Sequence, residues 1–142
     1  VFGKMAEPLG TFNAPIGRDT VHRKKMSTRS RHGKPALTFW KVLESFDQMT
    51  LIEAILGTGR THQIRVHFSD AKHPVVGDPT YGGVRAIKGI VDLPLRRAIE
   101  KLPALLLHAE SLSFHHPITG EILSFKVPLP DYFEHILNLL HE

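Results

Sequence analysis

The sequence predicts an α+β fold, with a mixed, mostly antiparallel sheet and a few flanking helices. Three observations support this: two pairs of apolar segments joined by short polar turns, and one amphipathic segment with helical spacing. The paired segments are residues 38–46 with 49–56 and residues 105–114 with 122–127, and the amphipathic segment is 131–140. With 142 residues, of which 42% are hydrophobic, the chain has enough apolar side chains for one core.

The N-terminal half of the chain predicts strands. Residues 11–16 are expected to be extended and to end at Gly17. Asp47 and Gln48 separate the two apolar segments that follow and predict the turn of a hairpin. Trp40, inside this hairpin, is expected to pack in the core rather than to stack on a nucleic-acid base.

A helix of about ten residues is predicted after Thr61, which is an acceptable N-cap, and Pro74 prevents its continuation. Alternating apolar residues over 64–68 would also fit a strand. Further on, Asp78 stands in a Gly-containing turn before a proline and is expected to fix that loop. Residues 84–103 predict a variable insertion with a short basic helix over 95–101, and the helix at 131–140 is expected to close the core.

Composition narrows the class of protein. No apolar run approaches the roughly 20 residues of a membrane span, so a membrane partner is not expected. The absence of cysteine excludes disulfides and thiolate metal sites, and it fits a reducing compartment such as the cytoplasm. The formal net charge of +4 favours a polyanionic partner.

Positive charge is concentrated between residues 18 and 34, a segment we call the basic loop. Seven basic residues face one acidic residue, Asp19, which gives +6 within this segment. The basic residues are Arg18, Arg23, Lys24, Lys25, Arg29, Arg31 and Lys34. Such a cluster can neutralise RNA phosphates and release their counterions, although a solvated, mobile loop is the alternative.

The densest group of functional side chains lies between Gly59 and Gly83. Polar residues that can bind phosphate or hold a carboxylate alternate there with apolar ones: Arg60, Thr61, His62, Gln63, Arg65 and His67 are interleaved with Ile64, Val66 and Phe68. If the helix forms, the first four polar residues surround its unpaired amides, where anions bind readily. A partly buried Arg65 would need an acidic partner.

This segment resembles the signature of the RluA-type pseudouridine synthases, which isomerise uridine in structured RNA. Three further pieces agree in order with that family: residues 14–19, residues 33–36 with Thr38, and residues 105–110 leading to His116-Pro117 and Gly120. The resemblance covers nearly the whole chain apart from 84–103. It implies that residues 1–142 form the C-terminal portion of a single pseudouridine synthase catalytic domain.

The resemblance also defines the expected site. The family carries its nucleophilic aspartate in a motif of the form HRLDxxTSG, which this sequence lacks, and none of its six aspartates stands in that context. The arginine that matches Arg65 pairs with this nucleophile, so Arg65 is the expected catalytic residue. Arg60, His62 and Gln63 are expected around the site, although a structural role at the helix start explains them equally well. Leu107 matches a residue that packs against the target base, or it is one more core leucine.

The resemblance implies no cofactor and no metal, and the spacing of His62, His67 and His73 does not match a zinc-binding helix. The expected partner is RNA, with large-subunit ribosomal RNA favoured and transfer RNA as the alternative. The protein is expected to be monomeric. Two other classes remain open: a non-catalytic RNA-binding module, which would use the same basic loop, and a structural or interaction domain.

Overall fold

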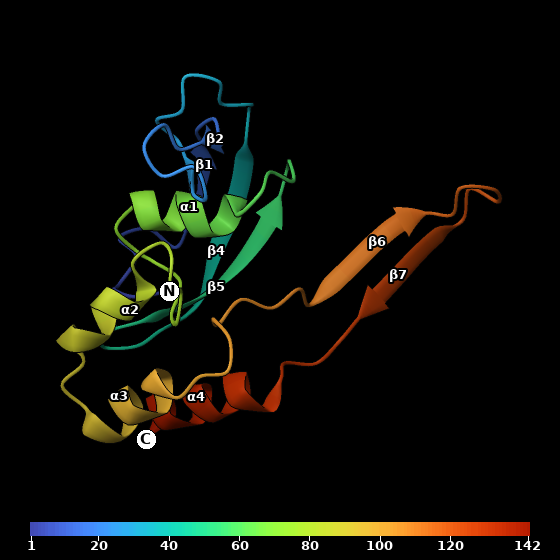
Figure 1. Ribbon diagram of the computed structural model, residues 1–142. Coiled ribbons are helices and arrows are strands. Elements are labelled where there is room, and N and C mark those ends of the chain that lie inside the picture. Colours follow the sequence, from blue (N-terminus) through green and yellow to red (C-terminus); the bar gives the residue numbers. More distant parts are fainter.

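A computed structural model describes residues 1–142 as a sheet region, a helical region and a projecting hairpin (Figure 1). The strands are β1 (Leu9–Asn13), β2 (Gly17–Arg18), β3 (Met26–Ser27), β4 (Leu37–Ser45), β5 (Thr50–Leu56), β6 (Ser111–His115) and β7 (Ile122–Lys126). The helices are α1 (Gln63–Asp70), α2 (Gly83–Ala86), the short 3-10 helix η1 (Ile87–Gly89), α3 (Leu93–Glu100) and α4 (Asp131–His141). This arrangement confirms the predicted α+β class.

All strand pairs are antiparallel, and they are divided among three sheets. The largest has the order β1-β4-β5, and the other two are the pairs β2-β3 and β6-β7. The predicted first hairpin is confirmed as β4 and β5, with a register irregularity between Val42 and Glu44. Strand β5 therefore lies at an edge of its sheet, and it leads the chain directly to the turn before α1.

Helix α1 lies beside the three-stranded sheet (Figure 1) and packs on it through an aromatic cluster. The ring of Phe68 in α1 lies 5.0 Å from that of Phe12 in β1, and Phe12 lies 5.8 Å from Trp40 in β4. A Cβ at Gly10 would lie 2.5 Å from the Trp40 ring, so only glycine at position 10 leaves room for the tryptophan. Trp40 is 9% exposed, which confirms that it is a packing residue.

The predicted strand over residues 11–16 was wrong in its bounds. Strand β1 ends at Asn13, and Gly17 belongs to β2 instead of ending a strand. Pro15 has no amide hydrogen to continue the ladder, and the chain turns there so that Ile16 bridges to Lys34. This bridge closes the base of the basic loop, because the amide of each residue donates to the carbonyl of the other at 2.9 Å.

Residues 84–103, which were expected to be a variable insertion, contribute to the core. Ile87, Ile90, Leu95 and Ile99 are four of the eight buried residues in the larger hydrophobic cluster. Asp92 caps α3 by accepting a hydrogen bond from the Leu95 amide at 2.7 Å. The predicted helix over 95–101 exists, shifted to begin at Leu93.

The second predicted hairpin is present but shorter than expected. Strand β6 begins at Ser111, and residues 105–107 run along the body of the domain, where the Leu106 amide donates to the Val76 carbonyl at 2.9 Å. Beyond this point β6 and β7 project away from the rest of the molecule (Figure 1). The terminal helix is confirmed as α4, which buries Phe133 and Ile136. No helix of the chain combines the length and the apolar character needed to cross a bilayer.

Candidate functional site

The turn before α1 is held by the side-chain amide of Gln63. Its oxygen accepts hydrogen bonds from the Thr58 hydroxyl at 2.7 Å and from the Arg60 amide at 2.9 Å. Its nitrogen donates to the Leu37 carbonyl at 2.8 Å and to the Thr38 hydroxyl at 2.9 Å. These four bonds use the full capacity of a carboxamide, and Gln63 is 3% exposed. Gln63 therefore builds the turn and has no polar atom left for a substrate.

His62 is the residue at the N-cap, where Thr61 was expected. Its backbone lies in the left-handed region, with φ of 58°, and its side chain makes no capping bond. A non-glycine residue in this conformation costs about 1–3 kcal/mol, and such residues cluster at functional sites. The strained backbone turns the imidazole away from the helix start and towards Tyr81, whose hydroxyl lies 2.8 Å from Nδ1.

His67, one turn further along α1, ties the helix to the sheet region. Its Nε2 donates a hydrogen bond to the Ala14 carbonyl at 2.9 Å. Its Nδ1 lies 2.9 Å from the hydroxyl oxygen of Thr38, which also accepts a hydrogen bond from Gln63. With 2% exposure, His67 is a structural residue rather than a ligand.

Arg65 pairs with Asp78 through two parallel hydrogen bonds. Its Nε donates to Oδ2 of Asp78 at 2.8 Å and its Nη2 donates to Oδ1 at 2.9 Å. The Arg65 side chain is 15% exposed and that of Asp78 is fully buried. This geometry occupies one edge of the guanidinium, while Nη1 and one hydrogen of Nη2 have no partner in the chain.

The pKa values of the pair reflect both burial and mutual contact. The hydrogen bonds that Arg65 donates to Asp78 raise the pKa of Arg65, although burial acts in the opposite direction. Burial raises the pKa of the Asp78 carboxyl, but the hydrogen bonds from Arg65 and from the amides of Thr80 and Tyr81 outweigh it, and the net pKa lies below its usual value. Both groups are therefore charged at neutral pH.

Asp78 also fixes the loop that follows α1, as the sequence predicted. Its Oδ1 accepts hydrogen bonds from the amides of Thr80 at 2.8 Å and Tyr81 at 3.1 Å. The backbone packs so closely here that a Cβ at Gly83 would lie 2.2 Å from the Val75 carbonyl oxygen and 2.5 Å from the Asp78 nitrogen. The acidic partner of Arg65 is thus held rigidly by its own loop.

Tyr81 joins three parts of the site, a role that sequence reasoning missed. Its ring covers the Arg65 guanidinium, with the central carbon 4.9 Å from the ring centroid. Its hydroxyl oxygen accepts a hydrogen bond from the Met26 amide at 2.9 Å, and it also forms a hydrogen bond with Nδ1 of His62. The hydroxyl therefore bridges β3 of the basic loop and the motif before α1. The Tyr-Gly-Gly sequence after Asp78 was the available signal, but it predicts only a turn.

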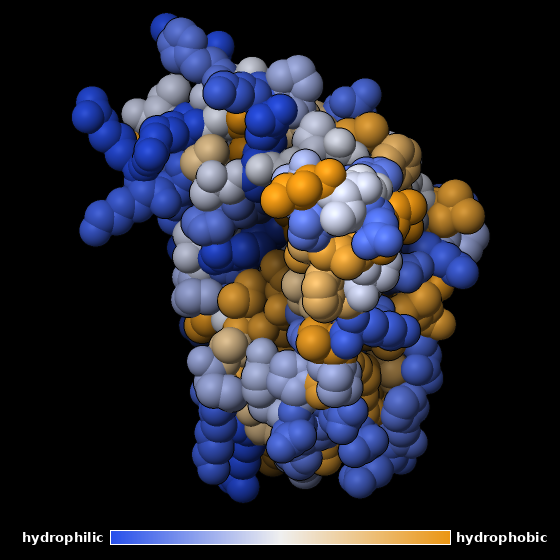
Figure 2. Space-filling view, turned by 90° about the vertical axis from the view of Figure 1, so that its right-hand side faces the viewer, coloured by the Kyte–Doolittle hydropathy of each residue, from blue (hydrophilic) through white to orange (hydrophobic).

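A polar cleft of about 420 Å³ opens between the basic loop and the turn before α1. We call it the basic cleft. It is lined by Ile16, Gly17, Arg18, Lys24, Met26, His32, Lys34, Gly59, Arg60, Thr61 and His62. Figure 2 shows hydrophilic side chains projecting at the top of the molecule, the end where the basic loop lies in Figure 1. Arg60 is also anchored, because its Nε donates to the Pro35 carbonyl at 3.0 Å.

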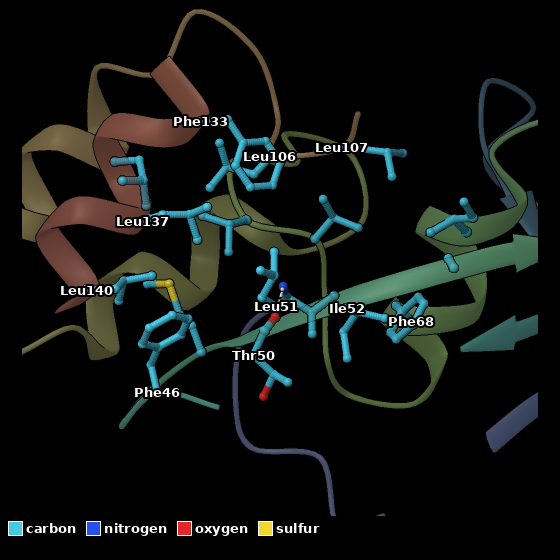
Figure 3. A pocket seen from close by; sticks show the side chains of 17 residues that line it. Phe46, Thr50, Leu51, Ile52, Phe68, Leu106, Leu107, Phe133, Leu137 and Leu140 are labelled. Carbon is cyan, nitrogen blue, oxygen red and sulfur yellow. Dashed lines mark hydrogen bonds between the residues drawn. The ribbon is translucent and has the colours of Figure 1, made fainter. Parts of the chain in front are cut away.

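An apolar groove lies elsewhere on the domain, bounded by β5, α1, α4 and the segment at 105–107 (Figure 3). Sixteen of its seventeen lining residues are hydrophobic. Leu107 follows Leu106 in the segment between α3 and β6. It lines this groove and is 39% exposed (Figure 3). Leu107 therefore belongs to a different depression from Arg60 and His62.

Known proteins resemble this chain in sequence and in structure. Residues 1–70 match the model of the RNA pseudouridylate synthase family. A Neisseria meningitidis protein named ribosomal large subunit pseudouridine synthase D is 46% identical over 92% of this chain and 34% of its own length. A Bacillus subtilis protein named an uncharacterized RNA pseudouridine synthase is 45% identical over 98% of this chain and 42% of its own.

The chain belongs to the RNA pseudouridine synthase family. A solved structure named human RNA pseudouridylate synthase domain containing 1 superposes with a TM-score of 0.71 at 32% identity, covering 90% of this chain and 51% of that one. These matches confirm the resemblance to the RluA-type family and the α+β fold. The chain spans about a third to a half of the length of these three relatives.

Within this member of the pseudouridine synthase family, the predicted site residues separate into distinct places. Arg60 and His62 line the basic cleft, as do Arg18, Lys24 and Lys34 of the basic loop. The other four basic residues of the loop, Arg23, Lys25, Arg29 and Arg31, lie outside it. Leu107 lines the apolar groove. Gln63 is buried with a saturated amide, which favours the structural role at the helix start over a contact with substrate.

Arg65 was expected to pair with an acid that this sequence does not contain, and that pairing stays a prediction. Its partner within the chain is Asp78. Asp78 cannot itself act as a nucleophile in this arrangement, because it is fully buried and both of its oxygens accept hydrogen bonds. No group of three histidine, aspartate or glutamate side chains is arranged to hold a metal ion.

Proposed function

We propose that this chain is part of an enzyme that isomerises specific uridines in RNA to pseudouridine. The observation that carries the proposal is the half-occupied guanidinium of Arg65. Asp78 holds one edge of it almost out of solvent, and the other edge keeps hydrogen-bond donors for a second carboxylate. An arginine can serve two carboxylates in this way because its five N–H groups point in fixed directions.

The second carboxylate is the nucleophilic aspartate that the family resemblance implies, which we place outside residues 1–142. In the reaction, the C1′–N1 bond of uridine breaks, the base turns over, and C5 bonds to C1′. One proton leaves C5 and one is taken up at N1, so product and substrate contain the same atoms and no cofactor is consumed. Arg65 would keep the attacking carboxylate ionised and oriented in a site with little water.

The remaining residues would bind the RNA. The seven basic residues of the loop supply positive charge for phosphates, and Arg60 and His62 continue that surface towards Arg65. Leu107 offers an aliphatic surface on which the displaced base could pack. Extruding a base from structured RNA costs a few kcal/mol, and phosphate contacts can offset this.

Large-subunit ribosomal RNA is the proposed substrate, since the Neisseria relative is named for that activity. The proposal also takes the chain to be the C-terminal portion of one catalytic domain, acting as a monomer in the cytoplasm. The lack of cysteine is in keeping with that compartment.

Tritium release tests the proposal, since isomerisation frees the hydrogen on C5. The full-length protein would be incubated with a large-subunit ribosomal RNA transcript that carries tritium at C5 of uridine. We expect release of label to solvent that stops at a small, fixed number of sites per transcript. Binding of the transcript without any release would contradict the proposal and favour a non-catalytic RNA-binding module.

A further inference from the structure

The basic cleft has the charge and the size of a binding site for more than one phosphate. Four positively charged side chains line it, Arg18, Lys24, Lys34 and Arg60, and no carboxylate does. The one acid of the basic loop, Asp19, is turned to its own backbone, where Oδ1 accepts the amides of Val21 at 2.9 Å and His22 at 2.7 Å. The positive charge of the cleft is therefore not neutralised from within.

The walls of the cleft are held in place. The base of the loop is closed by the bridge between Ile16 and Lys34, and β2 pairs with β3 beyond it. Across the cleft, the Tyr81 hydroxyl accepts a hydrogen bond from the Met26 amide of one wall and forms another with Nδ1 of His62 in the other. These contacts fix the distance between the walls before any ligand binds, which lowers the entropic cost of binding.

His62 adds a polar ring to the cleft lining. Its Nδ1 is engaged with the Tyr81 hydroxyl at 2.8 Å, whereas no residue of the chain forms a hydrogen bond with its Nε2. Burial and the nearby charge of Arg65 lower the pKa of His62, so the ring is neutral at physiological pH. The positive charge of the cleft therefore comes from its arginines and lysines.

We infer that the basic cleft holds consecutive phosphates of the RNA strand next to the target uridine, and that the rest of the basic loop contributes only diffuse charge. This inference rests on the proposed function, because it takes RNA to be the polyanion. It divides the seven basic residues into two groups. Arg18, Lys24 and Lys34 line the cleft, whereas Arg23, Lys25, Arg29 and Arg31 lie elsewhere on the same loop.

Two triple variants of the full-length protein test this division with the same loss of charge. One is Arg18→Ala, Lys24→Ala, Lys34→Ala, and the matched control is Arg23→Ala, Arg29→Ala, Arg31→Ala. The dissociation constant for a large-subunit ribosomal RNA transcript would be measured at several salt concentrations. Each phosphate contact contributes about 0.7–0.9 to the slope of log affinity against log salt, so the cleft variant should lower the slope by about 2–3.

The control variant should lower that slope by less than about 1, because its side chains make no fixed phosphate contacts. Equal losses in the two triple variants would overturn the inference and show that the loop acts through charge alone. The two proposals fail in different ways. If the wild-type protein releases no tritium but the cleft variant loses binding selectively, the phosphate site stands and the enzymatic function falls. If the wild-type protein is active and the two triple variants bind RNA with the same affinity, the enzymatic function stands and the phosphate site falls.

Discussion

Two regions of this molecule are built in opposite ways. Around α1, buried polar groups contact one another: Arg65, Asp78 and Tyr81 form a junction in which both carboxylate oxygens of Asp78 accept hydrogen bonds. The hairpin of β6 and β7 is exposed along both strands apart from Leu123 and packs mainly on itself. The junction depends on side chains brought together from distant parts of the chain, whereas the hairpin depends on local pairing. Substitutions should therefore cost much more in the junction than in the hairpin.

The largest effect is expected for Arg65→Ala. This change leaves the carboxylate of Asp78 buried without its partner, and breaking a buried pair costs about 3–5 kcal/mol. Chemical denaturation should show a loss of unfolding free energy of this size. Arg96→Ala is the matched control, since Arg96 pairs with Glu100 at the surface with 37% and 48% of the side chains exposed. A similar loss in both variants would contradict the distinct role of the junction.

Low pH should weaken the ion pair between Arg65 and Asp78. The loss of stability should be smaller than in Arg65→Ala, because protonation of Asp78 leaves both side chains in place. The pKa of Asp78 is lower in the folded chain than its ordinary value of 3.8. Its contribution to stability is therefore fully present above about pH 4 and is lost as pH falls through the folded pKa. Comparing unfolding free energies of the wild type and Asp78→Asn between pH 7 and pH 2 isolates this contribution. The gap between them should narrow as pH falls, and a constant gap would refute the assignment.

Gly83→Ala tests the tight packing behind Asp78. The new methyl group would meet the Val75 carbonyl at 2.2 Å, so the loop must shift. Overpacking of this kind costs about 1–3 kcal/mol. Gly89→Ala provides the control, because nothing lies within 4 Å of the added Cβ. Thermal unfolding should distinguish the two variants, and equal midpoints would show that the loop is not constrained at Gly83.

Phe114→Ala in the hairpin should have the smallest effect. Phe114 stacks on Phe125 across the strands, with ring centroids 6.0 Å apart, but the two residues are 43% and 56% exposed. An exposed cross-strand pair contributes about 0.2–1 kcal/mol. Chemical denaturation again provides the measurement. A loss as large as that of Arg65→Ala would mean that the hairpin packs against another part of the complete protein.

The sequence predicted those elements whose signal is local. The β4-β5 hairpin and α4 were recognised from apolar patterning and turn residues, and Trp40 was placed correctly in the core. The role of residues 84–103 was missed, because the four isoleucines and leucines that they bury become a core only when α4 and the N-terminal segment pack on them.

The site shows the same limit. Arg65 was expected to need an acidic partner, and Asp78 was expected to fix a loop. The two residues are thirteen positions apart, a spacing typical of no motif, so their pairing could not be predicted from the sequence. Tyr81 was missed because its contacts reach Met26, far away in the chain. For Gln63 the sequence left a site role and a structural role equally open, because its four hydrogen bonds within the fold cannot be recognised from a motif.

The central claim is that Arg65 serves two carboxylates, Asp78 within this chain and the nucleophile of the complete enzyme. Arg65→Lys in the full-length protein tests it most directly, since lysine keeps the charge but loses the planar fork. We expect Arg65→Lys to fold and its rate of tritium release from large-subunit ribosomal RNA to fall by roughly 100-fold or more. Removing a fixed electrostatic contact from an active site has an effect of this size. Release near the wild-type rate, from a variant with unchanged RNA binding, would contradict it.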